Sequence, residues 1–379
     1  MPPDSNYNIK VRPVKRTGPG VRAFRVEDLP GIVHLLGKIF PRSPEATLDI
    51  KEDIISELLL NNPWHDERLP SLVYESGEGK ITGFLGVAPR PMRINDRPVT
   101  ATISYNLMVD PESRSSLAGI SLVKAYLSGP QDLSFADSAT DTSRKLWESL
   151  GGISVPLYSL YWKHPLRPVG FAIHHLQKRS RFGLLLRASE PAGRFTDWMV
   201  DRFWKAGRDA GEFNGNYWSQ ETEAEELTAL IGRFSEKASL APVYTTETLS
   251  WLLNLAARTK RFGELKKEVI YGKNNKLAGW FIYYKNPGGV SEVLQIKSVP
   301  GKEKQVLMFL LQKAREQGAV GVAGRLEPDW FTVFPDAAFG FYMPGRVWML
   351  AHSANRDILR AFKGGDAFIT RIEGDMWLL

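Results

Sequence analysis

The chain has 379 residues, of which 43% are hydrophobic and 24% charged, an ordinary globular composition that excludes disorder along the whole chain. At roughly 100–200 residues per domain, this length favours two domains or three. The absence of cysteine excludes a disulfide framework, a thiolate metal site, an iron–sulfur cluster and a cysteine nucleophile. No apolar run approaches the ~18–20 residues of a membrane span, and the N-terminus lacks the apolar stretch of a secretory signal. We therefore expect a soluble, cytoplasmic protein.

Helices and strands alternate along the first half of the chain, after a polar stretch at 1–19 that we expect to be a flexible tail. The apolar residues recur at helical spacing in some segments and alternate as in strands in others. We expect helices at 26–40, 49–60, 115–128 and 138–150, and strands at 21–25, 71–75, 81–94, 99–109, 132–136 and 155–162.

The second half repeats much of this order of elements. It contains expected helices at 221–239, 246–255 and 303–317, and expected strands at 268–271, 276–284, 289–299 and 320–324. Three pairs of segments correspond in sequence and order: Lys80–Phe84 with Lys276–Trp280, Val109–Pro111 with Val299–Pro300, and Leu133–Asp137 with Val320–Gly324. A diverged internal duplication explains this order, and two copies are too few for a solenoid. The sequence therefore predicts two similar domains.

A basic segment separates the two copies. Residues 163–208 hold ten Lys or Arg and three Asp or Glu, an excess of +7 that equals the formal net charge of the whole chain. An aromatic stripe at helical spacing follows within it, formed by Phe195, Trp198, Met199, Arg202 and Phe203. We expect a connecting helix packed between the domains, and the alternative role is a lid or a wall of the acceptor site.

The stretch from Leu107 to Ile120 combines a strand, a turn and a helix N-terminus. The turn holds Arg114, small residues and Gly119. Free backbone N–H groups at a helix start, with the positive end of the helix dipole behind them, form an anion site. Small side chains let a pyrophosphate approach the backbone closely. This stretch therefore predicts a phosphate-binding loop.

The same stretch resembles the acyl-CoA-binding loop of GNAT-type N-acyltransferases, which reads Arg/Gln-x-x-Gly-x-Gly/Ala. The segment Arg114–Gly119 matches the first and last positions of this pattern, and Leu117 stands at the fourth. Val21–Ile32 looks like the opening strand and helix of the family, and Asp141–Gly152 looks like its late helix. The second copy has the order of elements but not the loop pattern, because its loop reads Val299–Gln305. The layout resembles tandem GNAT proteins such as mycothiol synthase and the Fem-type aminoacyl transferases.

This resemblance implies an α/β (α+β) protein of two GNAT-like domains, each a mixed central sheet flanked by helices, joined by a basic helical connector. We expect a first domain at 20–165 with the acyl-CoA loop, a basic aromatic connector at 166–207, and a second, degenerate domain at 208–379. The implied co-substrate is acetyl-CoA or another acyl-CoA, bound in the first domain only. Its implied binding residues are Met108, Val109, Arg114, Ser115, Ser116, Leu117, Ala118 and Gly119.

Two residues are the candidates for handling the acceptor amine. The family often uses a Tyr on the late helix as acid and a Glu on the fourth strand as base, but Trp147 takes the first position and the strand Thr100–Val109 contains no Glu. Tyr105 stands at one of the positions that such a carboxylate would occupy, and Asp137 ends the next strand. We expect Asp137 to act as general base and Tyr105 to position the amine or a relaying water. The alternative role of Asp137 is a helix N-cap.

No metal site is expected, because the adjacent His174 and His175 point to different faces of a helix and no His-Glu-x-x-His spacing occurs. The resemblance implies an N-acyltransferase that moves an acyl group, expected to be acetyl, from CoA to an amine of a small molecule, an amino sugar or a peptide. Two alternatives stay open: a Fem-like transferase that uses aminoacyl-tRNA, and a non-catalytic acyl-CoA-binding or structural protein. We do not expect nucleic acid as a partner, and a homodimer is left open.

Overall fold

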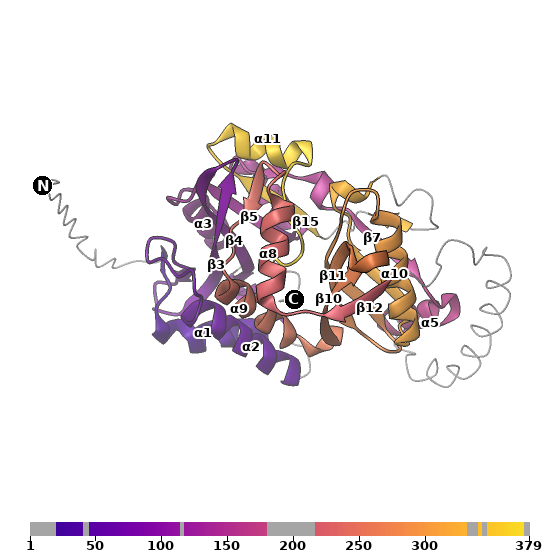
Figure 1. Cartoon of the computed structure of the whole chain (residues 1–379). Helices are drawn as coiled ribbons and strands as arrows, with labels where there is room; N and C mark the ends of the chain where they lie inside the picture. The colour runs from indigo at the N-terminus through magenta and orange to yellow at the C-terminus, as the bar shows by residue number, and fades with distance from the viewer. Residues whose placement is uncertain are drawn as a thin grey trace, which may run out of the picture.

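The computed structural model describes residues 20–40, 45–113, 117–179, 217–331, 340–342 and 347–374. Within these residues the chain forms two mixed sheets and the helices that cover them (Figure 1). None of the described helices combines the length and apolar character that crossing a bilayer requires. The first sheet contains most strands of the first half, and the second sheet contains most strands of the second half.

The first sheet runs in the order β1-β2-β3-β4-β5-β15-β6, with β9 paired to β3. Among its described strand pairs, β4 and β5 are parallel and the others are antiparallel. Its strands are β1 (Gly20–Ala23), β2 (Leu72–Glu75), β3 (Ile81–Ile94), β4 (Arg97–Val109), β5 (Leu133–Ala139), β6 (Ile153–Ser154), β9 (Leu240–Pro242) and β15 (Trp348–His352).

The second sheet has the same plan. It runs in the order β14-β7-β13-β12-β11-β10-β8, and its parallel pair in the described part of the chain is β12 with β13. Its strands are β7 (Tyr161–Pro165), β8 (Trp218–Glu221), β10 (Glu264–Tyr271), β11 (Leu277–Lys285), β12 (Val290–Ser298), β13 (Gly321–Arg325) and β14 (Gly340–Tyr342). The two mixed sheets, each with one parallel pair, confirm the fold class expected from the sequence.

The helices cover both faces of each of the two sheets. They are α1 (Leu29–Ile39), α2 (Glu45–Leu60), α3 (Ala118–Leu127), α4 (Asp141–Ser149), α5 (Pro168–Arg179), α8 (Ala224–Ser235), α9 (Thr246–Ala257), α10 (Glu303–Glu316) and α11 (Arg356–Gly364). Leu122 of α3 and Trp147 of α4 pack on one face of the first sheet, and Ile32 of α1 packs on the other. Val306 of α10 packs on the outer face of the second sheet.

One hydrophobic core joins the inner faces of the two sheets. Successive residues of β11 alternate between cores: Trp280 and Ile282 share a cluster with Ile103 and Phe135 of the first sheet, whereas Phe281 faces α10. In Figure 1, α8 lies between the strands of the two sheets, and its apolar residues belong to this shared cluster. The two halves therefore bury their apolar surface against each other.

The two sheets exchange a strand. The sequence predicts 155–162 as the last strand of the first half, and this is wrong, because β7 begins at Tyr161 and pairs with β13 and β14 of the second sheet. In return, β15 of the second half inserts between β5 and β6 of the first sheet. The apolar pattern predicts a strand but carries no information about its partner. A division of the sequence at residues 165 and 208 therefore assigns β7 and β15 to the half whose sheet they do not join.

The expected connector is described only in its first part. Helix α5 occupies 168–179, and its Phe171 packs against Val290 and Val320 of the second half. The aromatic stripe with Phe195 and Trp198 lies outside the described residues.

A chain that ends at Lys163 is expected not to fold as a stable monomer. It lacks β15, which leaves β5 as a bare strand edge, and it exposes the apolar face that Trp280 and Ile282 cover. Size-exclusion chromatography and near-UV circular dichroism check this, with co-expression of residues 1–159 and 160–379 as the control that restores both sheets. A soluble monomer ending at Lys163 with a cooperative unfolding transition would contradict the shared core.

Candidate active site

The two central parallel strands of the first sheet pair over a short distance and then part. The pairing runs from Ala101 with Leu133 to Ile103 with Phe135, although β4 continues to Val109. From Ser104 onward, the edge of β4 that faces β5 makes no ladder hydrogen bonds with it. We call this region the first gap. Backbone N–H and C=O groups at such an edge need partners, and a ligand with amide groups can supply them.

A bulge in β4 lies inside the first gap. Its pairing with β3 passes from Tyr105 opposite Gly86 to Met108 opposite Phe84, so that Asn106 and Leu107 together oppose one residue. Asn106 has a φ of 49°, which lies in the left-handed region. Asn is one of the few residues that tolerates this conformation. The bulge turns the strand and re-aims its backbone groups, as bulges beside binding sites do.

The segment after β4 leads to a helix N-terminus. Asp110 is buried, and it accepts a hydrogen bond from Lys38 Nζ at 3.0 Å, which raises the pKa of that lysine. The residues Arg114, Ser115 and Ser116 of the expected loop lie outside the described residues. Leu117 precedes α3 without a side-chain cap, and its side chain is 66% exposed. An α-helix N-terminus of this kind is suited to an anion, as the sequence pattern predicts.

The remaining expected binding residues lie where the first gap meets α3. Met108 is buried and Val109 is half-buried, and both lie at the end of β4, just before the loop. Ala118 is buried in the first turn of α3, and Gly119 follows it. A Cβ built on Gly119 would lie 3.4 Å from Val109 Cγ2, an ordinary contact. The strand end and the helix start are therefore held side by side.

Asp137 lies on β5, on the other side of the first gap. Its side chain is fully buried, and its carboxylate forms an ion pair with Arg325, which ends β13 of the second sheet. Gly374 packs so closely that a Cβ there would collide with the carboxylate. The N-cap of α4 is Thr140, whose hydroxyl accepts the N–H of Ser143, so Asp137 does not cap this helix. Asp137 thus joins the two sheets at the inner end of the gap.

Tyr105 faces the core from β4, immediately before the bulge. Its ring packs edge-on to Phe84 at 6.3 Å between centroids, and it occupies the space that a Cβ on Gly86 would fill. The hydroxyl is buried close to Ser71, and burial raises the pKa of Tyr105. The phenol therefore stays protonated near neutral pH and can donate. Trp147 packs in the core against Tyr126 at 5.8 Å.

The second sheet parts in the same way, but the chain itself fills the opening. Strands β12 and β13 pair from Val290 with Gly321 to Val293 with Gly324, and a register shift follows at Leu294. We call this region the second gap. The segment 367–374 contacts both of its strands: Arg371 N–H donates to Leu294 O at 3.0 Å, and Arg325 Nη1 donates to Thr370 O at 3.4 Å.

Side chains fix the segment 367–374 in the second gap. Gln295 Nε2 donates to Thr370 Oγ1 at 3.3 Å, and Arg371 Nη1 donates to Glu292 Oε2 at 2.8 Å. Thr370 and Arg371 are buried. Arg371 Nη1 also donates to Val293 O at 3.1 Å, so this segment takes the backbone carbonyls of Val293 and Leu294 in β12.

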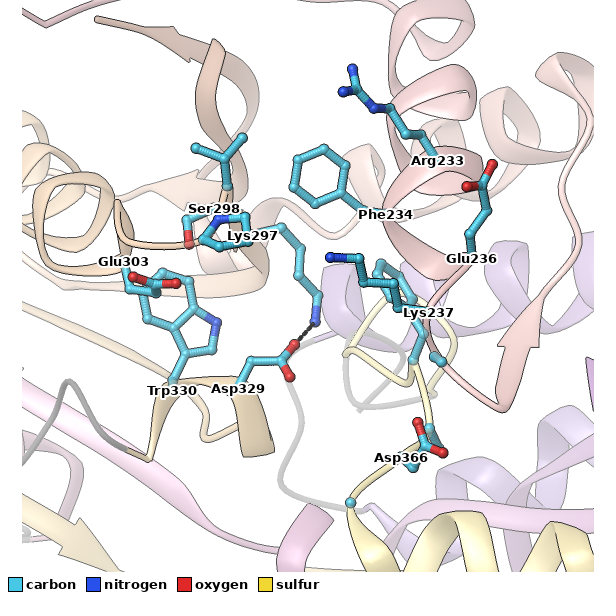
Figure 2. A pocket seen from close by; sticks show the side chains of 16 residues that line it. Arg233, Phe234, Glu236, Lys237, Lys297, Ser298, Glu303, Asp329, Trp330 and Asp366 are labelled. Carbon is cyan, nitrogen blue, oxygen red and sulfur yellow. Dashed lines mark hydrogen bonds and ion pairs between the residues drawn. The ribbon is translucent and has the colours of Figure 1, made fainter. Parts of the chain in front are cut away.

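A cavity of about 640 Å³ remains at the outer end of the second gap (Figure 2). Lys297 lines it and reaches Asp329 at 3.0 Å and Glu327 at 2.6 Å. Burial raises the pKa of Glu327 to about 7, although Lys297 acts in the opposite direction. The charged side chains of the lining are three cations and four acids, namely Arg233, Lys237, Lys297, Glu236, Glu303, Asp329 and Asp366. This balance does not favour a polyanion.

Three further residues lie around Asp137 and Tyr105 and could not be identified from the sequence motifs: Arg90, Arg325 and Glu373. All three are charged and buried. Arg90 interrupts an otherwise apolar part of β3, and this is the sequence signal that could have identified it. Asn106 carries a similar signal, because Asn is uncommon inside a strand.

No family model matches the sequence, and no curated protein matches it. The structure is similar to the GCN5-related N-acetyltransferase from Anabaena variabilis, with a TM-score of 0.56, 13% identity, and coverage of 90% of this chain and 75% of that chain. It is similar to the GCN5-related N-acetyltransferase from Kribbella flavida, with a TM-score of 0.52, 12% identity, and coverage of 88% and 71%. It is also similar to Saccharomyces cerevisiae N-myristoyltransferase with bound myristoyl-CoA, with a TM-score of 0.53, 11% identity, and coverage of 93% and 82%. These similarities confirm the fold expected from the sequence, two GNAT-like domains.

The Asp137–Arg325 pair is expected to couple the two sheets energetically. Asp137→Asn removes one partner of a buried ion pair and should cost about 3–5 kcal/mol of unfolding free energy. Arg325→Met should cost a similar amount, and the double variant should be more stable than the sum of the two losses predicts. Urea denaturation of the four proteins measures this coupling. Additive losses would show that the two side chains act independently.

Proposed function

We propose that the protein is an N-acyltransferase that binds an acyl-CoA in the first gap and transfers the acyl group, acetyl in the simplest case, to an amine. The observation that carries this proposal is the edge of β4 that is not paired with β5 beyond Ile103, which lies beside the N-terminus of α3. The edge fits an amide-containing pantetheine arm, and the helix start fits a pyrophosphate. The fold similarity to N-acetyltransferases and to N-myristoyltransferase supports the same reading.

The second half is not proposed as an acyl-CoA site. Its gap is filled by the segment 367–374, and the cavity at its outer end carries one more acid than cation. We therefore propose that each chain binds one molecule of acyl-CoA.

Tyr105 and Asp137 are proposed to act on the acceptor side of the first gap. Acyl transfer needs a neutral amine, a donor for the tetrahedral oxyanion, and departure of CoA as a thiolate, whose conjugate thiol has a pKa near ~8.5. The protonated phenol of Tyr105 is suited to donate a hydrogen bond. The guanidinium of Arg325 stabilises the ionised carboxylate of Asp137. Because this carboxylate is fully buried against Arg325, we propose that a water carries the proton from the amine to it. The role of Asp137 as general base stays a prediction.

Gly119→Asp tests the proposed site. The new carboxylate should repel the pyrophosphate and weaken acetyl-CoA binding about tenfold or more, which is about 1.4 kcal/mol. Folding should be kept, because an acidic residue in the first turn of a helix interacts favourably with the dipole, and a Cβ at this position meets only Val109 at 3.4 Å. Isothermal titration with acetyl-CoA measures the affinity, and thermal unfolding measures the stability.

Three variants are matched controls for this experiment. Gly119→Ala adds the Cβ without the charge and should bind acetyl-CoA nearly as well as the wild type. Lys302→Ala and Lys304→Ala change the corresponding loop of the second half and should leave the affinity unchanged. Wild-type affinity in Gly119→Asp would remove the site from this position. Turnover with an amine acceptor would separate an enzyme from a non-catalytic acyl-CoA-binding protein.

A further inference from the structure

Arg90 on β3 is a buried cation that forms no ion pair with another described residue. Its side chain is 4% exposed, and its guanidinium makes one described hydrogen bond, from Nη1 to the carbonyl of the adjacent Pro89 at 3.0 Å. Nε is buried and has no partner. Burial lowers the pKa of Arg90 to about 10, so the group stays charged at neutral pH. A buried guanidinium offers five N–H donors, and leaving them unused is costly.

The carboxylate of Glu373 is already engaged. Glu373 acts electrostatically on Arg90 but forms no described ion pair with it. One oxygen of Glu373 accepts the hydroxyl of Tyr244 at 2.8 Å. The other accepts Thr370 N–H at 2.6 Å and Thr370 Oγ1 at 2.7 Å. The donors of Arg90 therefore remain available to a ligand.

Arg90 lies on the acceptor side of the first gap. It pairs with Ala101, and Ala101 and Tyr105 point to the same face of β4 because side chains alternate along a strand. The four residue steps from Ala101 to Tyr105 span roughly 13 Å at ~3.3 Å per residue. Val109, where the phosphate loop begins, pairs with Gly83, seven residues from Arg90 and thus roughly 23 Å away. Arg90 is therefore too far from the loop to bind the pyrophosphate.

An aromatic wall lines this side of the molecule. The guanidinium of Arg90 stacks over Trp64 at 4.9 Å, and Trp64 contacts Tyr244 and Trp251, each at 6.1 Å between ring centroids. Tyr244 also lines a surface cavity of about 330 Å³ together with Arg93 of the same strand as Arg90. Tyr244 thus connects an open cavity with the buried polar group Arg90–Glu373.

We propose that Arg90 binds a carboxylate of the acceptor, so that the substrate of the proposed N-acyltransferase is an amine that carries a carboxylate some distance from the reacting nitrogen. The planar fork of Arg matches a carboxylate through two parallel hydrogen bonds. A phosphate dianion fits less well, because Glu373 is close and would repel a second negative charge. This inference rests on the proposed function, and it adds the class of acceptor.

The test follows the Nε–H signal of Arg90 by NMR in the full chain labelled uniformly with ¹³C and ¹⁵N. The probes are N-acetylglycine, 4-acetamidobutyrate and 6-acetamidohexanoate, which are acetyl-transfer products with spacers of increasing length. Their primary amides are the matched neutral controls. The signal is assigned through its own backbone resonances, and independently by its loss in Arg90→Lys, so the test does not depend on the variant folding. The Nε–H signal of Arg22 is the internal control, since that guanidinium is held by the carboxylates of Asp28 and Glu75.

We expect at least one carboxylate probe to shift the Arg90 signal saturably, while its amide does not and the Arg22 signal stays in place. If no carboxylate shifts it, or if acid and amide shift it equally, the inference is wrong. Titration with CoA in the same sample, followed at the amide signals of Gly119 and Ile120, separates the two proposals. CoA binding without a response at Arg90 would overturn only the acceptor class. A response at Arg90 without CoA binding would overturn the proposed function and leave the carboxylate site.

Discussion

Each of the two sheets is completed by a strand from the other half of the chain, and the arrangement of the candidate site depends on this exchange. β7 closes the second sheet beside β13, and β15 closes the first sheet beside β5. The strands that receive them, β5 and β13, are the ones that carry Asp137 and Arg325. The exchange therefore brings corresponding strand ends of the two copies together, and the ion pair between these two side chains joins them.

The two halves differ in what pairs with the backbone groups at the point where their parallel strands part. Parting two parallel strands leaves peptide groups that need hydrogen-bond partners. In the second half, the segment 367–374 supplies them, and Arg371 N–H bonds to the carbonyl of Leu294. In the first half, the edge of β4 from Ser104 to Val109 is not paired with β5. The second gap thus holds a segment of its own chain, whereas the first gap has the open strand edge that we propose as the acyl-CoA site.

Much of the fold could be predicted from local pattern. Apolar periodicity predicts most of the helices and strands, and the repeated Gly83 and Gly279 segments predict the duplication. Strand partners could not be predicted, because a residue such as Trp162 buries equally well under either sheet, and it is 1% exposed under the second. A sequence pattern specifies that a residue is buried without specifying the element that covers it.

The candidate site could be predicted only where it is local. The strand–turn–helix stretch around Gly119 is contiguous in sequence, whereas the partners of Asp137 are 188 residues and more away, since Arg325 comes from β13. Arg90 and Glu373 could not be placed beside Tyr105 and Tyr244 without the fold. Their charge inside apolar segments was the available signal. Contacts of this kind depend on tertiary packing, which periodicity does not encode.

Amide hydrogen exchange with and without acetyl-CoA tests most directly whether the ligand binds in the first gap and not in the second. The account predicts that acetyl-CoA slows exchange in 104–113 and 117–127, where β4 ends and α3 begins, and leaves 294–298 and 303–310 of the second half unchanged. Slowed exchange in 294–310 without any change in 104–127 would place the ligand in the second gap and contradict the account.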